Sequence, residues 1–92
     1  MPVSLDSTIA QSPLCLSADV EQEVVLMAVE RGLYFALDPI GSDVWRRIAQ
    51  PRNVKDLCGA LLADYDAPLA SIETDVLALL DTLAEAGVVD VK

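Results

Sequence analysis

The sequence predicts an α+β domain in which strands come first and helices follow. Strand-like residues precede the dipeptide Asp38-Pro39, and apolar residues recur with helical spacing after it. The chain of 92 residues has the length of one domain, and its 53% of hydrophobic residues suffices for one modest core. Residues 1–92 are therefore expected to form a single domain.

Three segments before Asp38 are predicted to be strands, because β-branched and apolar residues cluster in them. They span residues 14–20, 23–29 and 33–37. Glu30-Arg31-Gly32 supplies a glycine-containing turn, so the second and third segments are expected to form a hairpin. Residues 1–12 are polar and weakly patterned, and the sequence leaves open whether they add a strand or fray.

Two helices are predicted to follow the strands. Asp38 caps the first, since its carboxylate accepts from free N–H groups and Pro39 lacks a donor that this position does not need. Pro51 stops this helix. Asn53 caps the second, in which apolar residues fall at i, i+3, i+4, i+7, i+8 and i+11 from Val54.

A third helix is predicted from about residue 69 to 86, where Gly87 supplies the left-handed residue that commonly ends a helix. Its expected core face consists of Ile72, Val76, Leu79 and Leu83. A second row widens the apolar surface and either packs against a neighbouring element or lines a groove for an apolar ligand or peptide: Glu73, Leu77, Leu80 and Ala84. The opposite flank carries Asp75, Thr82 and Ala86. Val88, Val89 and Val91 either pack on the core or add a short strand.

Fifteen acidic residues against six basic ones give the chain a net charge of −9. This charge repels a phosphate backbone, so nucleic acids are not expected as partners. Six acids and no base lie between residues 64 and 85: Asp64, Asp66, Glu73, Asp75, Asp81 and Glu85. They form either a solvated surface or a field that steers a basic partner.

Four of the six bases lie close together in the sequence: Arg46, Arg47, Arg52 and Lys55. They are either ordinary solvated charges or a surface for a partner protein, separate from any peptide site.

The composition excludes most catalytic chemistry. The chain has no histidine, which removes the common nucleophile–base pairs, and its two cysteines, Cys15 and Cys58, are too few for a four-ligand zinc site. We expect no catalysis, no metal and no cofactor. Residues 1–10 do not resemble a signal peptide, and the longest apolar run, residues 24–29, is too short to span a membrane, so a cytoplasmic protein is expected.

The segment 33–37 is expected to form an edge of the three-stranded sheet, and it carries neither a proline nor an inward charge that would block pairing. Such an edge accepts an added strand. If the helix over residues 69–86 lies alongside, the edge and the helix together hold an extended peptide.

The order and spacing of the apolar and glycine residues resemble those of the PqqD-like family of peptide-binding domains, the RiPP recognition elements, over about residues 20–91. The matching motifs are Gly32-x-Tyr34-x-x-Leu37-Asp38-x-x-Gly41-x-x-Val44-Trp45, then Pro51-x-x-Val54-x-x-Leu57-x-x-x-Leu61-x-x-x-Tyr65-Asp66, then Asp75-Val76-x-x-Leu79-Leu80-x-x-Leu83-x-x-x-Gly87-Val88-Val89. The stretch from Val25 to Gly41 is most similar to free-standing leader-binding proteins of lasso-peptide biosynthesis. The family usually has asparagine where this chain has Asp38, and aspartate also caps a helix.

The resemblance implies a small winged-helix-like domain, with three antiparallel strands followed by three helices and no catalytic activity. It implies that the leader segment of a ribosomally made precursor binds as an extra strand, and that a separate cysteine peptidase then removes the leader before a cyclase closes the ring. Carried over by position, the peptide site consists of Leu33, Tyr34, Phe35, Ala36, Leu37, Glu73, Asp75, Val76, Leu77 and Leu80. The acids near this site predict a locally basic leader.

Two other functions are considered. A PqqD-type chaperone of the same family delivers its precursor to a radical SAM enzyme. A winged-helix DNA-binding protein shares the fold but needs a basic recognition helix, whereas the helix over residues 69–86 is acidic.

Overall fold

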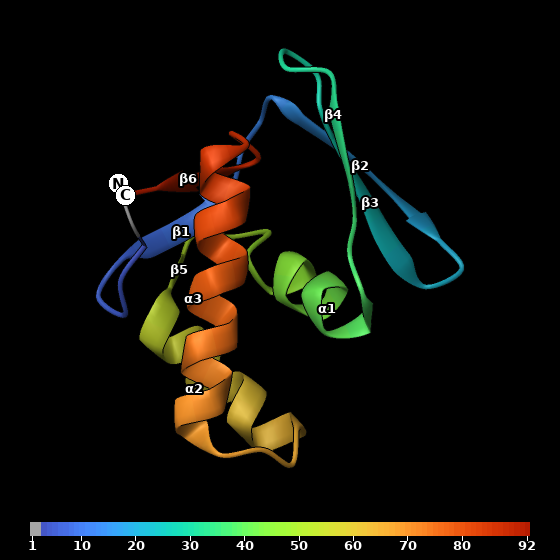
Figure 1. The fold of residues 1–92 in the computed structure, drawn as a ribbon. Helices are drawn as coiled ribbons and strands as arrows, with labels where there is room; N and C mark the ends of the chain where they lie inside the picture. Colours follow the sequence, from blue (N-terminus) through green and yellow to red (C-terminus); the bar gives the residue numbers. More distant parts are fainter. Residues whose placement is uncertain (1–2) are drawn as a thin grey trace.

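The computed structural model describes residues 3–92 and contains two small antiparallel sheets and three helices (Figure 1). In chain order the elements are β1 (Thr8–Gln11), β2 (Cys15–Val20), β3 (Glu23–Ala28), β4 (Leu33–Ala36), α1 (Pro39–Arg47), β5 (Arg52–Asn53), α2 (Val54–Asp64), α3 (Leu69–Glu85) and β6 (Val89–Val91). The prediction of an α+β domain with a three-stranded antiparallel sheet and three helices is confirmed.

The predicted strands form one sheet in the order β2-β3-β4. Two tight turns connect them, and Glu21, Gln22 and Gly32 have positive φ angles there. In the register, Leu26 lies opposite both Ser17 and Phe35. Because directly opposite residues share a face of an antiparallel sheet, buried Leu26 identifies the face that packs on the core.

A second sheet, in the order β5-β1-β6, decides both questions that the sequence left open about the two terminal regions. Residues 8–11 form β1, and residues 89–91 form β6, which pairs with it. Met1 and Pro2 lie outside the described residues. The two-residue strand β5, which pairs with Thr8 and Ile9, was not predicted.

The first two helices are capped by the residues that the sequence predicts. Asp38 Oδ1 accepts from the N–H of Gly41 at 2.6 Å, and Asn53 Oδ1 accepts from the N–H groups of Lys55 and Asp56. Gly87 adopts φ +80° just after α3, as predicted for the residue that ends this helix. The helix α1 ends at Arg47, well before Pro51, because the following residues turn into β5.

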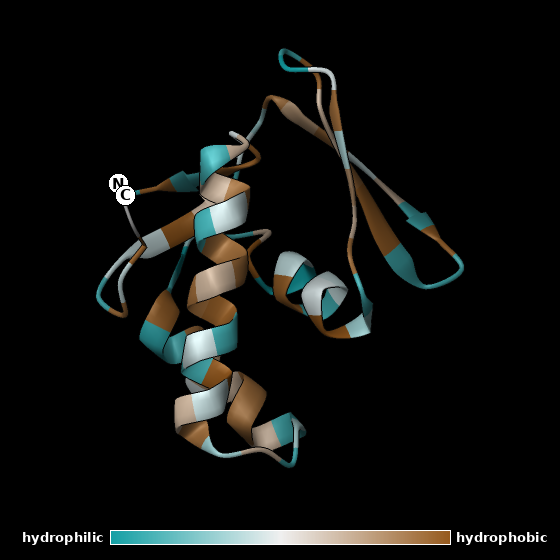
Figure 2. Ribbon diagram, viewed as in Figure 1, coloured by the Kyte–Doolittle hydropathy of each residue, from teal (hydrophilic) through white to brown (hydrophobic). Residues whose placement is uncertain are grey.

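The core lies where β3, the three helices and the second sheet meet. Figure 2 shows that β3 and all three helices contain apolar stretches. Its fully buried side chains include Ile9, Leu26, Ile48, Leu57, Leu61, Leu80, Leu83 and Val88. Ser42 is also fully buried, and its hydroxyl accepts from Val24 N–H and donates to Leu37 O. This hydroxyl therefore joins α1 to the ends of β3 and β4.

The core face of α3 differs from the prediction at one position. Ile72, Val76 and Leu83 are buried as expected, but Leu80 takes the place of Leu79: Leu80 is 0% exposed, whereas Leu79 is half-buried. α3 packs against α2 and β6, and Leu80 belongs to the core cluster that includes residues of both elements. Within residues 3–92, no helix combines the length and the apolar character needed to cross a membrane.

Candidate functional site

One edge of β4 has no strand partner in the described residues. β4 pairs with β3 alone, and Leu37 N–H donates to Val24 O at 2.9 Å. The alternation of an antiparallel ladder then directs the backbone of Phe35 toward β3 and turns the N–H and C=O groups of Tyr34 and Ala36 outward. These groups can pair with an added strand.

The side chains of β4 divide between two faces. Phe35 packs against the core opposite Leu26, and Leu37, two residues further on, is buried on the same side. Tyr34 points to the outer face and is 72% exposed. A strand added to the edge of β4 would continue the sheet, so its side chains would alternate between the face toward the helices and the outer face.

A hollow of about 220 Å³ lies between α1 and α3, next to the end of β4. We call it the Leu79 hollow, and it is lined by Asp38, Ile40, Gly41, Val44, Asp75, Val76 and Leu79. Gly41 leaves room for the side chain that caps α1, because a Cβ atom there would lie 3.0 Å from Asp38 Oδ1, and Leu79 Cδ2 lies on the same side at van der Waals distance. The walls are mainly apolar, which suits an aliphatic side chain.

A second hollow, of about 100 Å³, also has Ile40 in its lining. It shares Ile40, Asp75 and Val76 with the Leu79 hollow and adds side chains from α2 and the loop that follows it, among them Leu61 and Tyr65. Ile40 borders both hollows and is 53% exposed, although it is a large aliphatic residue. The N-terminal half of α3 therefore offers two adjoining apolar depressions.

The C-terminal end of α3 is tied to the β3–β4 turn. The guanidinium of Arg31 donates to the backbone carbonyl of Glu85, and Ala86 and Gly87 line a small hollow of about 170 Å³ together with Ala28 and Val29. The β3–β4 turn thus meets α3 at Arg31, and the end of β4 meets it again at the Leu79 hollow. The flank of α3 that lies toward the β3–β4 turn and the start of α1 carries Asp75, Leu79 and Ala86.

Asp75 is the exposed charge at this flank. The other acid of the Leu79 hollow, Asp38, is engaged in capping α1. Asp75 forms none of the ion pairs found among residues 3–92. The site therefore presents a carboxylate at one end and Arg31 at the other.

The sequence-predicted site residues fall into two groups. Leu33, Tyr34, Phe35, Ala36 and Leu37 form and extend β4, and Asp75 and Val76 line the hollow beside its end. Glu73, Leu77 and Leu80 lie elsewhere.

The prediction that Glu73 and Leu80 line the peptide site is corrected by where the structure places these two side chains. Leu80 is fully buried, so it belongs to the core and not to an accessible wall. Burial raises the pKa of the Cys58 thiol, and the charge of Glu73 raises that pKa further, which places Glu73 beside α2. Leu77 follows Glu73 by one helical turn and packs against the core on this flank. The sequence did not indicate that Leu79 and Ile40 line the hollow. For Ile40 a signal was available, since it is a large apolar residue in the first turn of α1.

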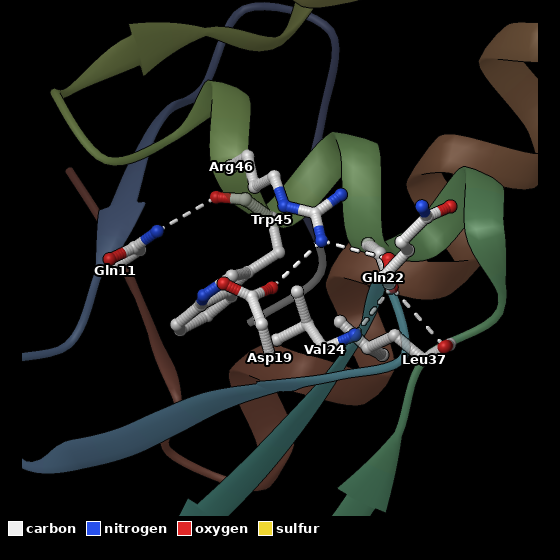
Figure 3. A network of polar contacts seen from close by, with 8 residues as sticks. Gln11, Asp19, Gln22, Val24, Leu37, Trp45 and Arg46 are labelled. Carbon is white, nitrogen blue, oxygen red and sulfur yellow. Dashed lines mark hydrogen bonds and ion pairs between the residues drawn. The ribbon is translucent and has the colours of Figure 1, made fainter.

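The four bases do not form one free surface. Arg46 donates to Asp19 at 2.8 Å and to the carbonyl of Gln22 at 2.9 Å, which ties the β2–β3 turn to α1 (Figure 3). Arg47 pairs with Asp43 at 3.0 Å and also with Asp64. Arg52 lies in β5, and Lys55 is exposed on α2. Arg46 and Arg47 thus serve contacts within the molecule.

Asp43 links α1 to the end of α2. It accepts from Arg47 and from the hydroxyl of Tyr65 at 2.8 Å. Burial alone would raise the pKa of Asp43, but these hydrogen bonds outweigh it and hold the pKa below its usual value, while the bond to Asp43 raises the pKa of Tyr65. Residues 3–92 bring no three metal-binding side chains together.

The family model described as coenzyme PQQ synthesis protein D (PqqD) matches residues 23–89. A PqqA binding protein of Bradyrhizobium diazoefficiens is 41% identical over 73 residues, which are 78% of this chain and 69% of that protein. A solved structure of TbiB1 in complex with the TbiA(beta) leader peptide has a TM-score of 0.81 and 28% identity, and the match covers 88% of this chain and 94% of that one.

Proposed function

The chain belongs to the PqqD family, and on this premise we propose that it is a non-catalytic recognition protein that binds the leader segment of a ribosomally synthesised precursor peptide. The observation that carries the proposal is the unpaired edge of β4 beside the two hollows along α3. The solved structure with a TM-score of 0.81 is that of a complex with a leader peptide, which supports this choice of ligand.

The proposed binding mode uses two kinds of contact. The outward backbone groups of Tyr34 and Ala36 pair with an extended leader, and these bonds do not depend on the leader's sequence. Apolar leader side chains enter the Leu79 hollow and the adjoining hollow at Ile40. Two such side chains, at about 1.5–3 kcal/mol each, supply a large part of the roughly 8 kcal/mol of a micromolar complex.

The finer proposal is that the bound leader is presented to a separate cysteine peptidase that removes it during lasso-peptide maturation. The resemblance of residues 25–41 to free-standing lasso leader-binding proteins supports it. A second candidate is delivery of the precursor to a radical SAM enzyme, which the 41% identity to a PqqA binding protein favours. Incubating the complex of chain and precursor with each purified enzyme distinguishes them, because only the true partner acts faster on the bound precursor.

The binding mode is tested by fluorescence anisotropy with a labelled leader peptide. Ala36→Pro removes an outward N–H of β4 and is expected to weaken leader binding at least about tenfold. The matched control is Ser17→Pro, which by the same alternation removes an outward N–H at the other edge of the sheet and is expected to leave binding within about twofold.

Circular dichroism is used to check that both variants fold. A second test needs no mutation of the chain and uses a series of leader peptides N-methylated at successive residues. Strand addition predicts that affinity falls at alternate leader positions. Equal affinity across that series, or wild-type binding by folded Ala36→Pro, would show that the leader does not pair with β4.

A further inference from the structure

The hydrogen-bond ladder between β3 and β4 is interrupted where β4 ends. Val25 and Ala36 are the last directly opposite pair of the two strands. Val24 and Leu37 follow, and a regular antiparallel ladder would join them by two bonds. One of these bonds is present, since Leu37 N–H donates to Val24 O at 2.9 Å. In place of the other, the Ser42 hydroxyl accepts from Val24 N–H at 2.8 Å and donates to Leu37 O at 3.2 Å (Figure 3).

The Ser42 side chain links α1 to the sheet from a fully buried position. It is 0% exposed, and its hydroxyl both accepts and donates, which offsets the loss of water around a buried polar group. A serine in a helix often bonds back to a carbonyl of the same helix, whereas this hydroxyl reaches from α1 to the sheet. One turn further along α1, Arg46 makes a second attachment, to Asp19 and to the carbonyl of Gln22.

The helix α1 also forms one wall of the Leu79 hollow. Val44 lines this hollow, as does the capping residue Asp38, which lies two residues beyond Ala36. The proposed leader therefore meets a sheet edge and a hollow that α1 and α3 enclose. The position of the hollow relative to the edge depends on how α1 is attached to the sheet, and Ser42 makes that attachment at the end of β4.

We propose that Ser42 is a positioning residue for leader binding, whose hydroxyl fixes the Leu79 hollow relative to the free edge of β4. A leader then pairs with the edge and places one aliphatic side chain, its anchor, in the hollow at the same time. The inference rests on the proposed function, because it assumes that a leader is bound at β4. Without the hydroxyl, Val24 N–H either moves onto Leu37 O, which displaces the start of α1, or loses its partner, which leaves α1 loosely held.

The test measures how strongly the anchor contributes to leader binding, by fluorescence anisotropy. An alanine scan of the leader against the wild-type chain identifies the anchor, as the aliphatic residue whose replacement weakens binding at least about fivefold to wild type but not to Leu79→Ala. With Ser42→Ala, replacing the anchor is expected to weaken binding less than about twofold, because the hollow no longer lies where the anchor reaches it. Ser42→Thr retains a hydroxyl and is expected to restore the full effect.

Asp43→Asn is the matched control. It weakens the contact of the same helix with Tyr65, at the end of α2, and leaves the bonds of Ser42 intact. Replacing the anchor should therefore weaken binding to Asp43→Asn as much as to wild type. If Ser42 serves only the stability of the fold, folded Ser42→Ala keeps the full effect of the anchor, and that result overturns the inference while the proposed function stands.

Hydrogen exchange of the wild-type chain decides the question if Ser42→Ala does not fold. The amide of Val24 donates to Ser42, so the full leader at saturation is expected to slow its exchange at least about fivefold more than the leader without its anchor. Equal slowing by the two leaders would overturn the inference and leave the proposed function intact. Absence of leader binding by the wild-type chain would reject the proposed function itself, and the inference with it.

Discussion

Leu79 and Leu80 are adjacent in the sequence and have opposite roles in the structure. Leu80 is fully buried in the core, whereas Leu79 is half-buried and lines the hollow beside β4. Apolar spacing identified α3 and three of its four core positions. Apolar spacing could not show which of the two flanks of the helix is buried, since that depends on which neighbouring elements cover each flank.

These residues give a prediction about which flank of α3 binds the leader. Leu79→Ala is expected to weaken leader binding about five- to tenfold in anisotropy titrations, because an apolar contact in the hollow is lost. Leu77→Ala is the matched control, a half-buried leucine on the other flank, and is expected to bind normally. Weak binding by Leu77→Ala together with normal binding by Leu79→Ala would place the groove on the opposite flank.

Leu80→Ala is expected to act on stability instead. Truncating a fully buried leucine costs about 2–5 kcal/mol of unfolding free energy, measurable by urea denaturation. Below its unfolding transition the variant should bind leader like the wild type. Wild-type stability with impaired binding would contradict the assignment of Leu80 to the core.

At the level of elements, the parts with strong local signals were predictable and the parts defined by pairing were not. The helix caps at Asp38 and Asn53 and the turn at Gly32 are carried by single residues with known preferences. The strands β1, β5 and β6 contain four, two and three residues, too few to show a period, and they exist because they pair with each other. The free edge of β4 was predictable, whereas the hollows beside it depend on how α1 packs against α3.

The contact between α1 and the end of α2 gives a prediction about pH. Asp43 has a pKa below its usual value in the folded chain, so its bonds to Arg47 and Tyr65 stabilise the fold above about pH 4 and are lost as the pH falls through the folded pKa. Asp43→Asn is therefore expected to lower the unfolding free energy by about 1–2 kcal/mol at pH 7. The difference from wild type should shrink below about pH 4 in denaturation curves.

Asp66→Asn is the control, since Asp66 is exposed and next to Tyr65 but forms none of the ion pairs among residues 3–92. It should leave stability nearly unchanged. A loss for Asp43→Asn that persists undiminished at pH 3 would show that the ionised carboxylate is not the source of the stability.

At the level of the whole molecule, a net charge of −9 governs the approach of a peptide. The structure leaves Asp75 as an exposed carboxylate beside the Leu79 hollow that caps no helix, while Glu73 lies by α2. A leader with lysine or arginine near its docking segment is therefore expected to bind more weakly as salt rises from about 50 to 500 mM, because the Debye length shortens from roughly 14 to 4 Å.

Asp75→Asn should flatten this salt dependence, and Glu73→Gln should change it less. Both are read from anisotropy titrations with the same leader at several salt concentrations. A salt-independent affinity for the wild type, or tighter binding by Asp75→Asn, would mean that the acidic flank serves solvation and plays no part in recognition.

The unpaired edge of β4 also bears on how the free chain behaves in storage and in the cell. A short strand with unpaired backbone groups and no blocking proline or lysine is a template for self-pairing and aggregation. At neutral pH, mutual repulsion between copies opposes this, but that protection vanishes near the isoelectric point of about 4.1. A bound leader would cover the edge, so the empty chain should become turbid near that pH before the leader complex does.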